Sequence, residues 1–581
     1  MSTDLLFEHF STLATAPDGI ARLRELILQL AVRGKLGTQD AGDEPASRLL
    51  EKIRKEKTRL IKNGDIKRTD QFLPVDPEEC QFDIPDGWQW TRLGTLVADS
   101  KQDIVDGPFG SDLHSAEYVD SGVPVIRLQN VQRNQFLNKN IRFLTSDKAE
   151  YLSRHNFVSG DIVITKLGEP VGKACIVPEY LKSGIFVADI IRIRLDSRFV
   201  DTNYITFMIN SPFISVKFNG LVKGITRARV NLTKVREMVI PLPPLAEQHR
   251  IVAKVDRLMA LCDELEARQQ LERAGCLKLG TASLAGLQNA THPEEFGRQW
   301  AQVCDAFDLI LDCPENVAVL RQTILQLAVQ GRLVRQEPGD ELTNKMVEKI
   351  KKEKERLVKD GQIKDDGKYD PIEDDEISFS IPKAWIWIRL EEITQKIGSG
   401  STPRGGKSVY QQKGIPFLRS QNVWNEGLSL DNVARISKEI HSQMSGTHVR
   451  PRDILLNITG ASIGRSCVVP DNFMEGNVSQ HVSIIRTVDE NIRNYLHYCI
   501  ISPYFQNRIM DVQVGMSREG LSKKSLKDLL IPLPPLAEQH RIVAKVDALM
   551  ALCDALESRL KERAGVQTRF ANNFVKDMGM E

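Results

Sequence analysis

The stretch IPLPPLAEQHRIVAKVDRLMALCD occupies residues 240–263, and IPLPPLAEQHRIVAKVDALMALCD occupies residues 531–554. The two copies differ only at Arg257, whose counterpart is Ala548. In each copy two prolines precede a segment whose apolar residues step by four and three, which is the spacing of a helix with a heptad seam. Glu247 lies in the expected first turn, where the helix dipole favours a carboxylate. The chain is therefore predicted to contain the same long helix twice.

The predicted seam needs a partner, because a lone helix cannot bury it. Nearly identical seams within one chain suggest that the two helices pair with each other, antiparallel if the halves obey a pseudo-two-fold axis. About 30 helical residues at ~1.5 Å each would span roughly 45 Å. The seam residues are Ile251, Val255, Leu258, Cys262 and Leu265 in the first copy and Ile542, Val546, Leu549, Cys553 and Leu556 in the second.

The rest of the chain repeats as well, with less identity. The matching pairs are LRELILQLAVRGKL at 23–36 with LRQTILQLAVQGRL at 320–333, IPDGWQWTRL at 84–93 with IPKAWIWIRL at 381–390, and GDIVITKLGEPVGKACIVPE at 160–179 with RDILLNITGASIGRSCVVPD at 452–471. Length changes fall inside the poorly matching stretches, where loops that carry specificity are expected. The highly charged segment 51–62 favours a solvated helix face, and the alternative is contact with a partner subunit or with DNA phosphates.

Between Trp88 and Ile240, and again in the second half, short β-type runs are punctuated by glycine and proline. These patterns predict a mixed α+β fold, with two α/β globules separated by long helices that form an antiparallel coiled-coil spacer. The expected regions are an N-terminal helical region 1–80, a first globule 81–243, a central helical region 244–377 with its spacer helix at 244–270, a second globule 378–534 and a C-terminal spacer helix 535–581.

Bulk composition fits a soluble, cytoplasmic protein. Of the 581 residues, 41% are hydrophobic and 27% are charged, and no window carries the eighteen or so apolar residues that span a bilayer. The N-terminus lacks the basic and apolar regions of a secretory signal. Nine cysteines without a C-x-x-C pair indicate a reducing compartment. The net charge of +1 neither indicates nor excludes nucleic acid.

Catalytic motifs are absent from the sequence. GSTPRGGKS at 400–408 has one residue too many for a phosphate-binding loop. Ser502-Pro503-Tyr504-Phe505 lacks the second proline and the acidic or amide residue of an adenine methyltransferase tetrapeptide. No nucleophile elbow or zinc-spaced cluster occurs. We therefore predict no catalytic residue, no metal and no cofactor in this chain.

The duplicated PLPPLAEQHRIVAKVD element, each time after a variable α/β globule, resembles the specificity subunit of type I restriction–modification systems. The resemblance covers essentially the whole chain. It implies that each globule is a target-recognition domain for double-stranded DNA, and that the helices dock two modification subunits. It also implies restriction subunits in the complex, with S-adenosylmethionine, ATP and Mg bound by the partners. Membrane partners are not expected.

The resemblance directs attention to polar, glycine-rich, basic loops at 106–115, 220–231, 399–408 and 514–525. Because the globules have diverged, they would read different half-sites, with arginine on guanine and asparagine or glutamine on adenine as the commonest contacts. An ordinary solvated loop would look the same in sequence. The candidate DNA-binding residues are Ser111, His114, Lys223, Arg227, Arg229, Arg404, Lys407, Arg518, Lys523 and Lys524.

For the spacer and the interface with partner subunits, the candidates come from the duplicated helix. They are Glu247, Gln248, Ile251, Val255 and Leu258, with Glu538, Gln539, Ile542, Val546 and Leu549 in the second copy. Two other interpretations remain open at this point. One is a protein–protein scaffold with two adaptor globules, and the other is an enzyme that uses the loop at 400–408.

Overall fold

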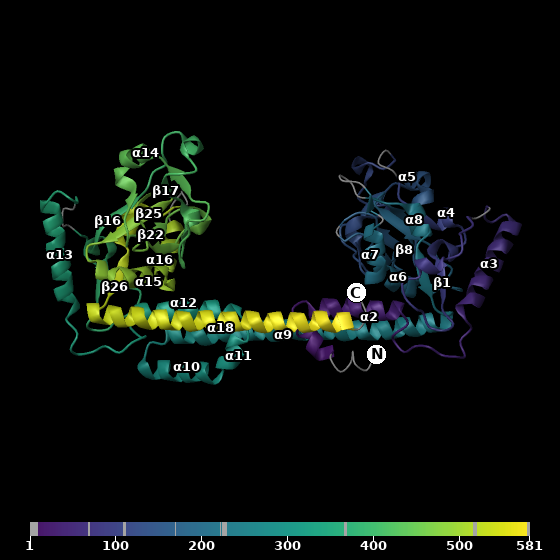
Figure 1. The fold of residues 1–581 in the computed structure, drawn as a ribbon, viewed down its shortest axis with the longest axis horizontal. Coiled ribbons are helices and arrows are strands. Elements are labelled where there is room, and N and C mark those ends of the chain that lie inside the picture. Colours follow the sequence, from purple (N-terminus) through teal and green to yellow (C-terminus); the bar gives the residue numbers. More distant parts are fainter. Residues whose placement is uncertain are drawn as a thin grey trace. The chain divides into compact units, whose positions relative to one another are not determined.

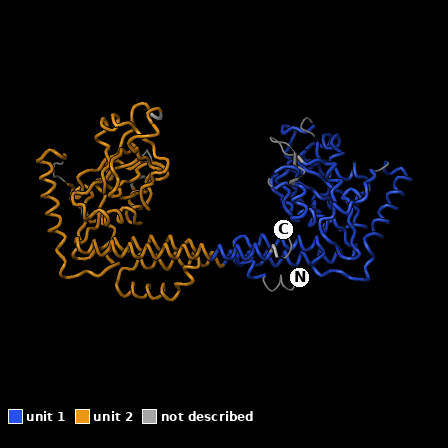
Figure 2. Tube along the Cα trace, viewed as in Figure 1, with its two compact units in different colours: residues 1–271, 563–581 blue, residues 272–562 orange. Residues whose placement is uncertain are grey.

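The computed structural model describes residues 10–67, 70–108, 112–168, 170–220, 222–223, 229–364, 369–514 and 520–577. It divides into two compact units, which Figure 2 distinguishes by colour. Unit 1 comprises residues 1–271 and 563–581, and unit 2 comprises residues 272–562. Two long helices, α9 (Leu245–Asn289) and α18 (Leu536–Asp577), each contribute to both units.

Unit 1 begins with two helices and continues into a globule of two four-stranded sheets. The strand orders are β6-β3-β10-β7 and β2-β11-β8-β9, and only β3 and β10 pair in parallel. The main elements are α2 (Gly19–Val32), α3 (Ala46–Asn63), β1 (Gln89–Arg92), β2 (Ile104–Asp106), β3 (Val123–Ile126), β6 (Arg142–Leu144), α5 (Ser146–Tyr151), β7 (Asn156–Val158), β8 (Ile162–Thr165), β9 (Ala174–Ile176), β10 (Ser183–Phe186), β11 (Ile190–Ile193), α6 (Thr202–Asn210), α7 (Pro212–Gly220), α8 (Leu232–Arg236) and β14 (Val239–Leu242). Short hairpins are formed by β4 (Val131–Gln132) with β5 (Gln135–Phe136) and by β12 (Val222–Lys223) with β13 (Arg229–Val230).

Unit 2 has the same sheet topology, with strand orders β20-β17-β24-β21 and β16-β25-β22-β23. Its main elements are α10 (Pro293–Asp305), α11 (Phe307–Leu311), α12 (Glu315–Val329), α13 (Thr343–Lys359), β15 (Ile386–Arg389), β16 (Thr394–Ser399), β17 (Ile415–Leu418), β18 (Val423–Trp424), β19 (Gly427–Leu428), β20 (Ala434–Ile436), α14 (Lys438–Gln443), β21 (His448–Val449), β22 (Ile454–Asn457), β23 (Ser466–Val468), β24 (Gly476–Val478), β25 (Val482–Thr487), α15 (Arg493–Ile501), α16 (Pro503–Val514), α17 (Lys523–Asp528) and β26 (Leu530–Leu533). The predicted mixed α+β fold with an internal repeat is confirmed. In the parts of the chain that the structure describes, no helix combines the length and apolarity needed to cross a membrane.

The heptad seam of each repeated helix packs mainly within its own half. The seam residues of α9 lie in one core with Leu23, Ile27 and Leu30 of α2. Those of α18 lie in one core with α12, which runs beside α18 in Figure 1. Arg24 of α2 also forms ion pairs with α9, and Arg321 of α12 forms the equivalent pairs with α18.

The prediction that the two seams bury each other is therefore corrected. Each seam packs instead against the helix at the start of its own repeat. The far end of each long helix joins the other unit's core: Ala571 and Phe574 of α18 lie in unit 1, and Leu284 and Leu287 of α9 lie in unit 2 with Leu556. The repeated helices are also longer than the predicted 30 residues, because α9 has 45 and α18 has 42.

Glu247, a residue predicted for the spacer or the partner interface, is buried at the start of α9. It accepts hydrogen bonds from Trp88 Nε1 at 2.8 Å, Gln39 Nε2 at 2.8 Å and Thr38 Oγ1 at 3.0 Å. Gln248 is also buried and donates to the carbonyl of Pro243. These groups fix the start of the helix to the strand and loops before it.

Unit 2 repeats this junction. Glu538 accepts from Trp385 Nε1 at 3.0 Å and from Gln336 Nε2 at 3.0 Å, and burial raises the pKa of its carboxyl. Nine of the ten residues predicted for the spacer and the partner interface are buried within their own units, and Leu549 is half-buried. Their role toward partner subunits stays a prediction.

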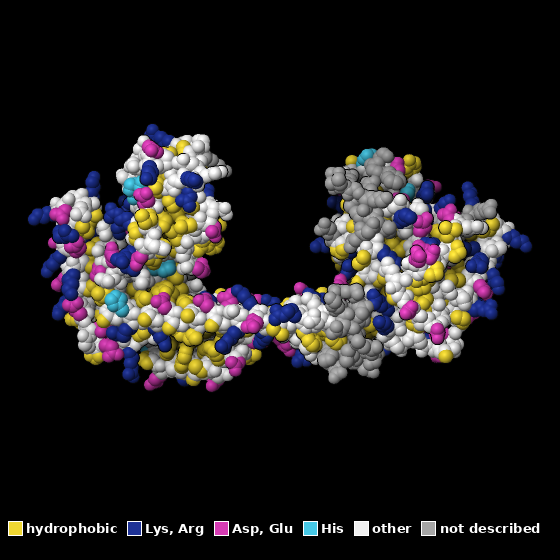
Figure 3. Space-filling view, viewed as in Figure 1, with side chains coloured by type: hydrophobic (Ala, Val, Ile, Leu, Met, Phe, Trp, Pro, Cys, Tyr) yellow, Lys and Arg dark blue, Asp and Glu magenta, His cyan; other side chains and the backbone are white. Residues whose placement is uncertain are grey.

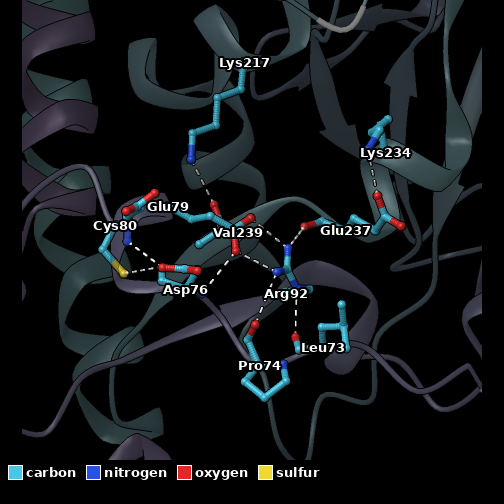
Figure 4. Close-up of polar contacts among 11 residues, drawn as sticks. Leu73, Pro74, Asp76, Glu79, Cys80, Arg92, Lys217, Lys234, Glu237 and Val239 are labelled. Atoms are coloured by element: carbon cyan, nitrogen blue, oxygen red, sulfur yellow. Dashed lines mark hydrogen bonds and ion pairs between the residues drawn. The ribbon is translucent and has the colours of Figure 1, made fainter.

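A second set of contacts centres on Arg92 of β1, and Figure 4 shows it for unit 1. The Arg92 guanidinium binds the Glu79 carboxylate at 2.7 Å and the carbonyls of Leu73 and Glu237 at 3.0 and 2.9 Å. In unit 2, Arg389 makes the same set of contacts with Glu376 and neighbouring carbonyls. Each globule is therefore joined to the rest of its unit by equivalent contacts.

Candidate nucleic-acid interface

In each unit, several loops meet at one edge of the sheet that contains β11 or β25. Because β2 and β8 both run antiparallel to β11, their carboxyl ends meet its amino end. The same holds for β16 and β22 beside β25. We call the resulting surface the loop edge. It comprises residues 106–108, 166–168, 170–173 and 187–189 in unit 1, and 400–408, 458–465 and 479–481 in unit 2.

A glycine begins each loop edge. Gly107 donates its N–H to the Ile190 carbonyl at 3.2 Å, and Gly400 donates to the Val482 carbonyl at 3.1 Å. A Cβ at Gly107 would overlap the carbonyl of Val187, and one at Gly400 would overlap the carbonyl of Val478. Glycine at these positions lets the loop pass directly over the neighbouring backbone.

The loop edge of unit 1 contains a charged pair. Lys166 Nζ lies 2.6 Å from Asp106 Oδ2, and the Lys166 side chain is only 8% exposed. His155 Nδ1 lies 2.7 Å from the Asp106 carbonyl oxygen. The Lys166 backbone N–H donates to Asp189, which fixes the hairpin between β8 and β9 against the start of β11.

The loop edge of unit 2 has threonine, glutamine and histidine side chains in the equivalent place. Thr402 Oγ1 donates to Gln480 Oε1, whose amide nitrogen lies 3.0 Å from His481 Nε2. His481 Nδ1 in turn lies 2.5 Å from Thr459 Oγ1. Thr402, Gln480 and His481 are exposed. Ile458, at the position of Lys166, presents no polar group.

Side chains on the neighbouring hairpins differ as well. In unit 2, the Arg465 guanidinium lies over the Trp424 ring at 4.1 Å, and Trp424 is 41% exposed. In unit 1 the equivalent pair is Lys173 and Gln132, whose Nζ and Oε1 are 3.4 Å apart. A stacked arginine and an exposed indole are suited to aromatic or base-stacking contacts. None of these four residues was predicted, because each pair joins two separate segments.

The structure locates some of the predicted residues and leaves others outside the described residues. Arg404 is exposed on the loop edge of unit 2, and His114 is exposed in the segment between β2 and β3 of unit 1. Lys523 and Lys524 are exposed in the first turn of α17. Gly520 forms a β-bridge with Thr459, so the carboxyl end of the loop at 514–525 adjoins the loop edge of unit 2.

For Lys223 and Arg229, in the hairpin of β12 and β13, the structure describes the backbone only. Lys223 pairs with Arg229 between β12 and β13. The side chains of Lys223, Arg229 and Lys407 lie outside the described residues, and so do Ser111, Arg227 and Arg518 as a whole. Their predicted contacts remain untested.

Two segments of the chain match one family model, the type I restriction modification DNA specificity domain, at residues 111–273 and 382–564. The chain belongs to this family. Each match includes most of one globule and the first part of the repeated helix after it, so one family domain corresponds to one half of the repeat. The EcoEI specificity subunit of Escherichia coli is 30% identical over 95% of this chain and 93% of its own length. The EcoAI specificity subunit of Escherichia coli is 31% identical over the same shares of the two chains.

Among solved structures, a chain from work on complex assembly and conformational transition of the type I R-M system aligns with 85% of this specificity-subunit chain and 98% of its own length. It has 20% sequence identity and a TM-score of 0.49. The HsdS subunit from Thermoanaerobacter tengcongensis aligns with 84% of this chain and 98% of its own length, with 20% identity and a TM-score of 0.41.

Proposed function

We propose that this chain selects the DNA target of a type I restriction–modification complex, with the loop edge of each unit reading one half of an asymmetric, bipartite site. The chain itself performs no catalytic step. Modification subunits supply S-adenosylmethionine-dependent adenine methylation, and restriction subunits supply ATP-driven cleavage. Membership of the specificity-subunit family supports this division of roles.

One observation carries the proposal of two different half-sites. The two globules have the same strand order and equivalent contacts at Arg92 and Arg389, yet the side chains on their loop edges differ. Unit 1 has the ion pair of the buried Lys166 with Asp106, whereas unit 2 has the exposed side chains of Gln480 and His481. Since identical readers would recognise identical half-sites, readers that differ in their hydrogen-bonding groups recognise different ones.

The loop edges suit DNA because their groups can address base edges in the major groove. An amide such as Gln480 can donate and accept at once, which matches adenine N6 and N7. Lysine can bind guanine O6 and N7, and surrounding cations bind phosphates and set the register. Sequence preference would come from the loop edges, while the repeated framework holds them in place.

Selection from a pool of randomised DNA duplexes tests this function. The chain is assembled with its modification subunits, and bound duplexes are recovered and sequenced. The proposal predicts enrichment of two different short sequences at a fixed spacing. Binding without sequence preference would contradict it and would favour a protein–protein scaffold.

A further inference from the structure

A basic hollow of about 680 Å³ lies in unit 2 between α13, the start of β16 and α17. Seven of the residues that line it are lysine or arginine, and one is glutamate. Figure 3 shows Lys and Arg side chains gathered between α13 and the globule of this unit. The hollow lies away from the polar groups of the loop edge, toward the other end of β16.

Only part of this positive charge is neutralised within the protein. Arg486 binds the Asp453 carboxylate at 2.6 Å, and Lys527 pairs with Glu391. Lys396 donates to the carbonyl of Gly446 at 2.8 Å, which carries no net charge.

The exposed residues Arg450 and Lys523 add charge that no carboxylate offsets. Within the residues that the structure describes, neither cation has a carboxylate at ion-pair distance. Burial lowers the pKa of Lys396, and the nearby charges of Arg486, Arg450 and Lys523 lower it further. The hollow therefore has a positive potential that an anion would relieve.

Among its described residues, unit 1 differs from unit 2 at three positions of this region, although its backbone is equivalent there. The strand registers place Asp103 at the position of Lys396, and Val158 at that of Arg450. The equivalent of Lys523 is Leu232, since each is the first residue after the cap of its helix. Asp103 and the nearby Asp99 oppose the charge of Lys57 in unit 1. At these three described positions, unit 2 has a positive charge and unit 1 has none.

We propose that the basic hollow binds phosphate groups of the DNA backbone beside the half-site read by unit 2, and that unit 1 makes no equivalent contact. The proposal rests on the function proposed above. Lys396 lies three residues before Ser399 at the loop edge, or about 10 Å along β16. This distance corresponds to about three nucleotides of one DNA strand, which are spaced 3.4 Å apart along the helix axis. Lys523 lies three residues after Gly520, which forms a β-bridge with Thr459 of the loop edge, so a short segment joins the hollow to the loop edge.

Salt-dependent binding of a duplex that carries the recognised site, measured with the assembled complex, tests this contact. Each phosphate contact to B-DNA contributes a slope of about 0.9 in log affinity against log salt. Arg450→Ala with Lys523→Ala should make the slope less steep by about 1 to 2 and should leave the recognised sequence unchanged. Arg54→Ala with Lys55→Ala, which removes two exposed cations from α3 of unit 1, is the matched control and should keep the wild-type slope.

A slope for the double variant that equals the wild-type slope would overturn the proposal. Arg450→Gln with Lys523→Gln repeats the test with longer side chains, in case the alanine variant unfolds. Inorganic tripolyphosphate distinguishes the source of the phosphate: if it binds the hollow and the DNA slope is unchanged, the site serves a free polyphosphate and the DNA contact is wrong. If the wild-type complex bound the recognised duplex and a scrambled duplex equally well, that result would instead contradict the proposed function.

Discussion

The indole Nε1 of Trp88 donates to Oε2 of Glu247 at 2.8 Å, across 159 residues of sequence. The equivalent bond from Trp385 to Glu538 is 3.0 Å long. A variable globule therefore lies between two residues that are fixed to each other. Its loops can change between relatives of this fold without changing how the globule joins the long helix.

Replacing Glu247 tests that junction. Glu247→Ala leaves the buried Trp88 and Thr38 donors without their acceptor, so we expect unit 1 to lose about 2–4 kcal/mol of stability. Hydrogen exchange of the amides in α2 and the start of α9 measures this loss locally. Glu264→Ala, at an exposed position of the same helix, is the control. Equal protection in the two variants would show that the junction does not stabilise the unit.

Lys217 gives unit 1 a dependence on pH. Burial lowers the pKa of this lysine from its ordinary 10.5 to about 8, while its ammonium donates to the Val239 carbonyl at 3.2 Å (Figure 4). Between these pH values the unfolded chain binds a proton that the folded chain has released. Stability should therefore rise with pH from about 8 to 10.5, by about 1–3 kcal/mol.

Denaturant unfolding at pH 7.5 and at pH 10 measures this effect. In Lys217→Met the rise in stability with pH should be smaller than in the wild type, because Lys217 no longer contributes. A smaller rise should remain, since Lys57, whose pKa is also lowered to about 8, is present in both proteins. The same rise in the variant and the wild type would mean that Lys217 does not titrate in this range.

Gly400 should be required for recognition by unit 2. An alanine Cβ there would overlap the Val478 carbonyl, and relieving that overlap costs about 1–3 kcal/mol and displaces the loop edge. Gly398→Ala is a close control, because a Cβ two residues earlier on β16 meets no atom within 4 Å. We expect Gly400→Ala alone to weaken binding of the recognised duplex, as measured by titration of the assembled complex. Equal affinity in the two variants would place the loop edge outside the DNA contact.

His481 and Lys166 should control different halves of the target. His481→Ala removes the ring that joins Gln480 to Thr459, so preference in the second half-site should relax by about 1–3 kcal/mol per affected base pair. Lys166→Ala should relax the first half-site only. Selection from randomised duplexes with each variant gives the two profiles. A change in the same half-site for both variants would refute separate readers.

Much of the scaffold is predictable from local sequence signals. The prolines before Leu245 and the 3.6-residue periodicity after it predict the start of α9, and Gly and Pro mark the strand ends of both globules. The end of α9 is different. Gly275, Gly280 and Gly286 disfavour a helix, yet α9 continues to Asn289 because Leu284 and Leu287 are buried in a core with α10 and α11. Tertiary packing outweighs local propensity there.

The partner of the heptad seam was also beyond the sequence pattern. The pattern of Ile251 and Val255 requires an apolar surface, but α2 and the other repeated helix both offer one. The loop edges were predictable only as loops. Thr402, Thr459 and His481 come from three separate segments, and the pairing of β16, β22 and β25 brings them together. Their contact depends on topology, which a single stretch of sequence does not encode.

Long-read mapping of adenine methylation, in cells that express this chain with its modification subunit, tests most directly whether two different readers define one target. The account predicts a single two-part motif, with unlike halves and a constant unspecified gap. A motif of one short half, or two identical inverted halves, would contradict it.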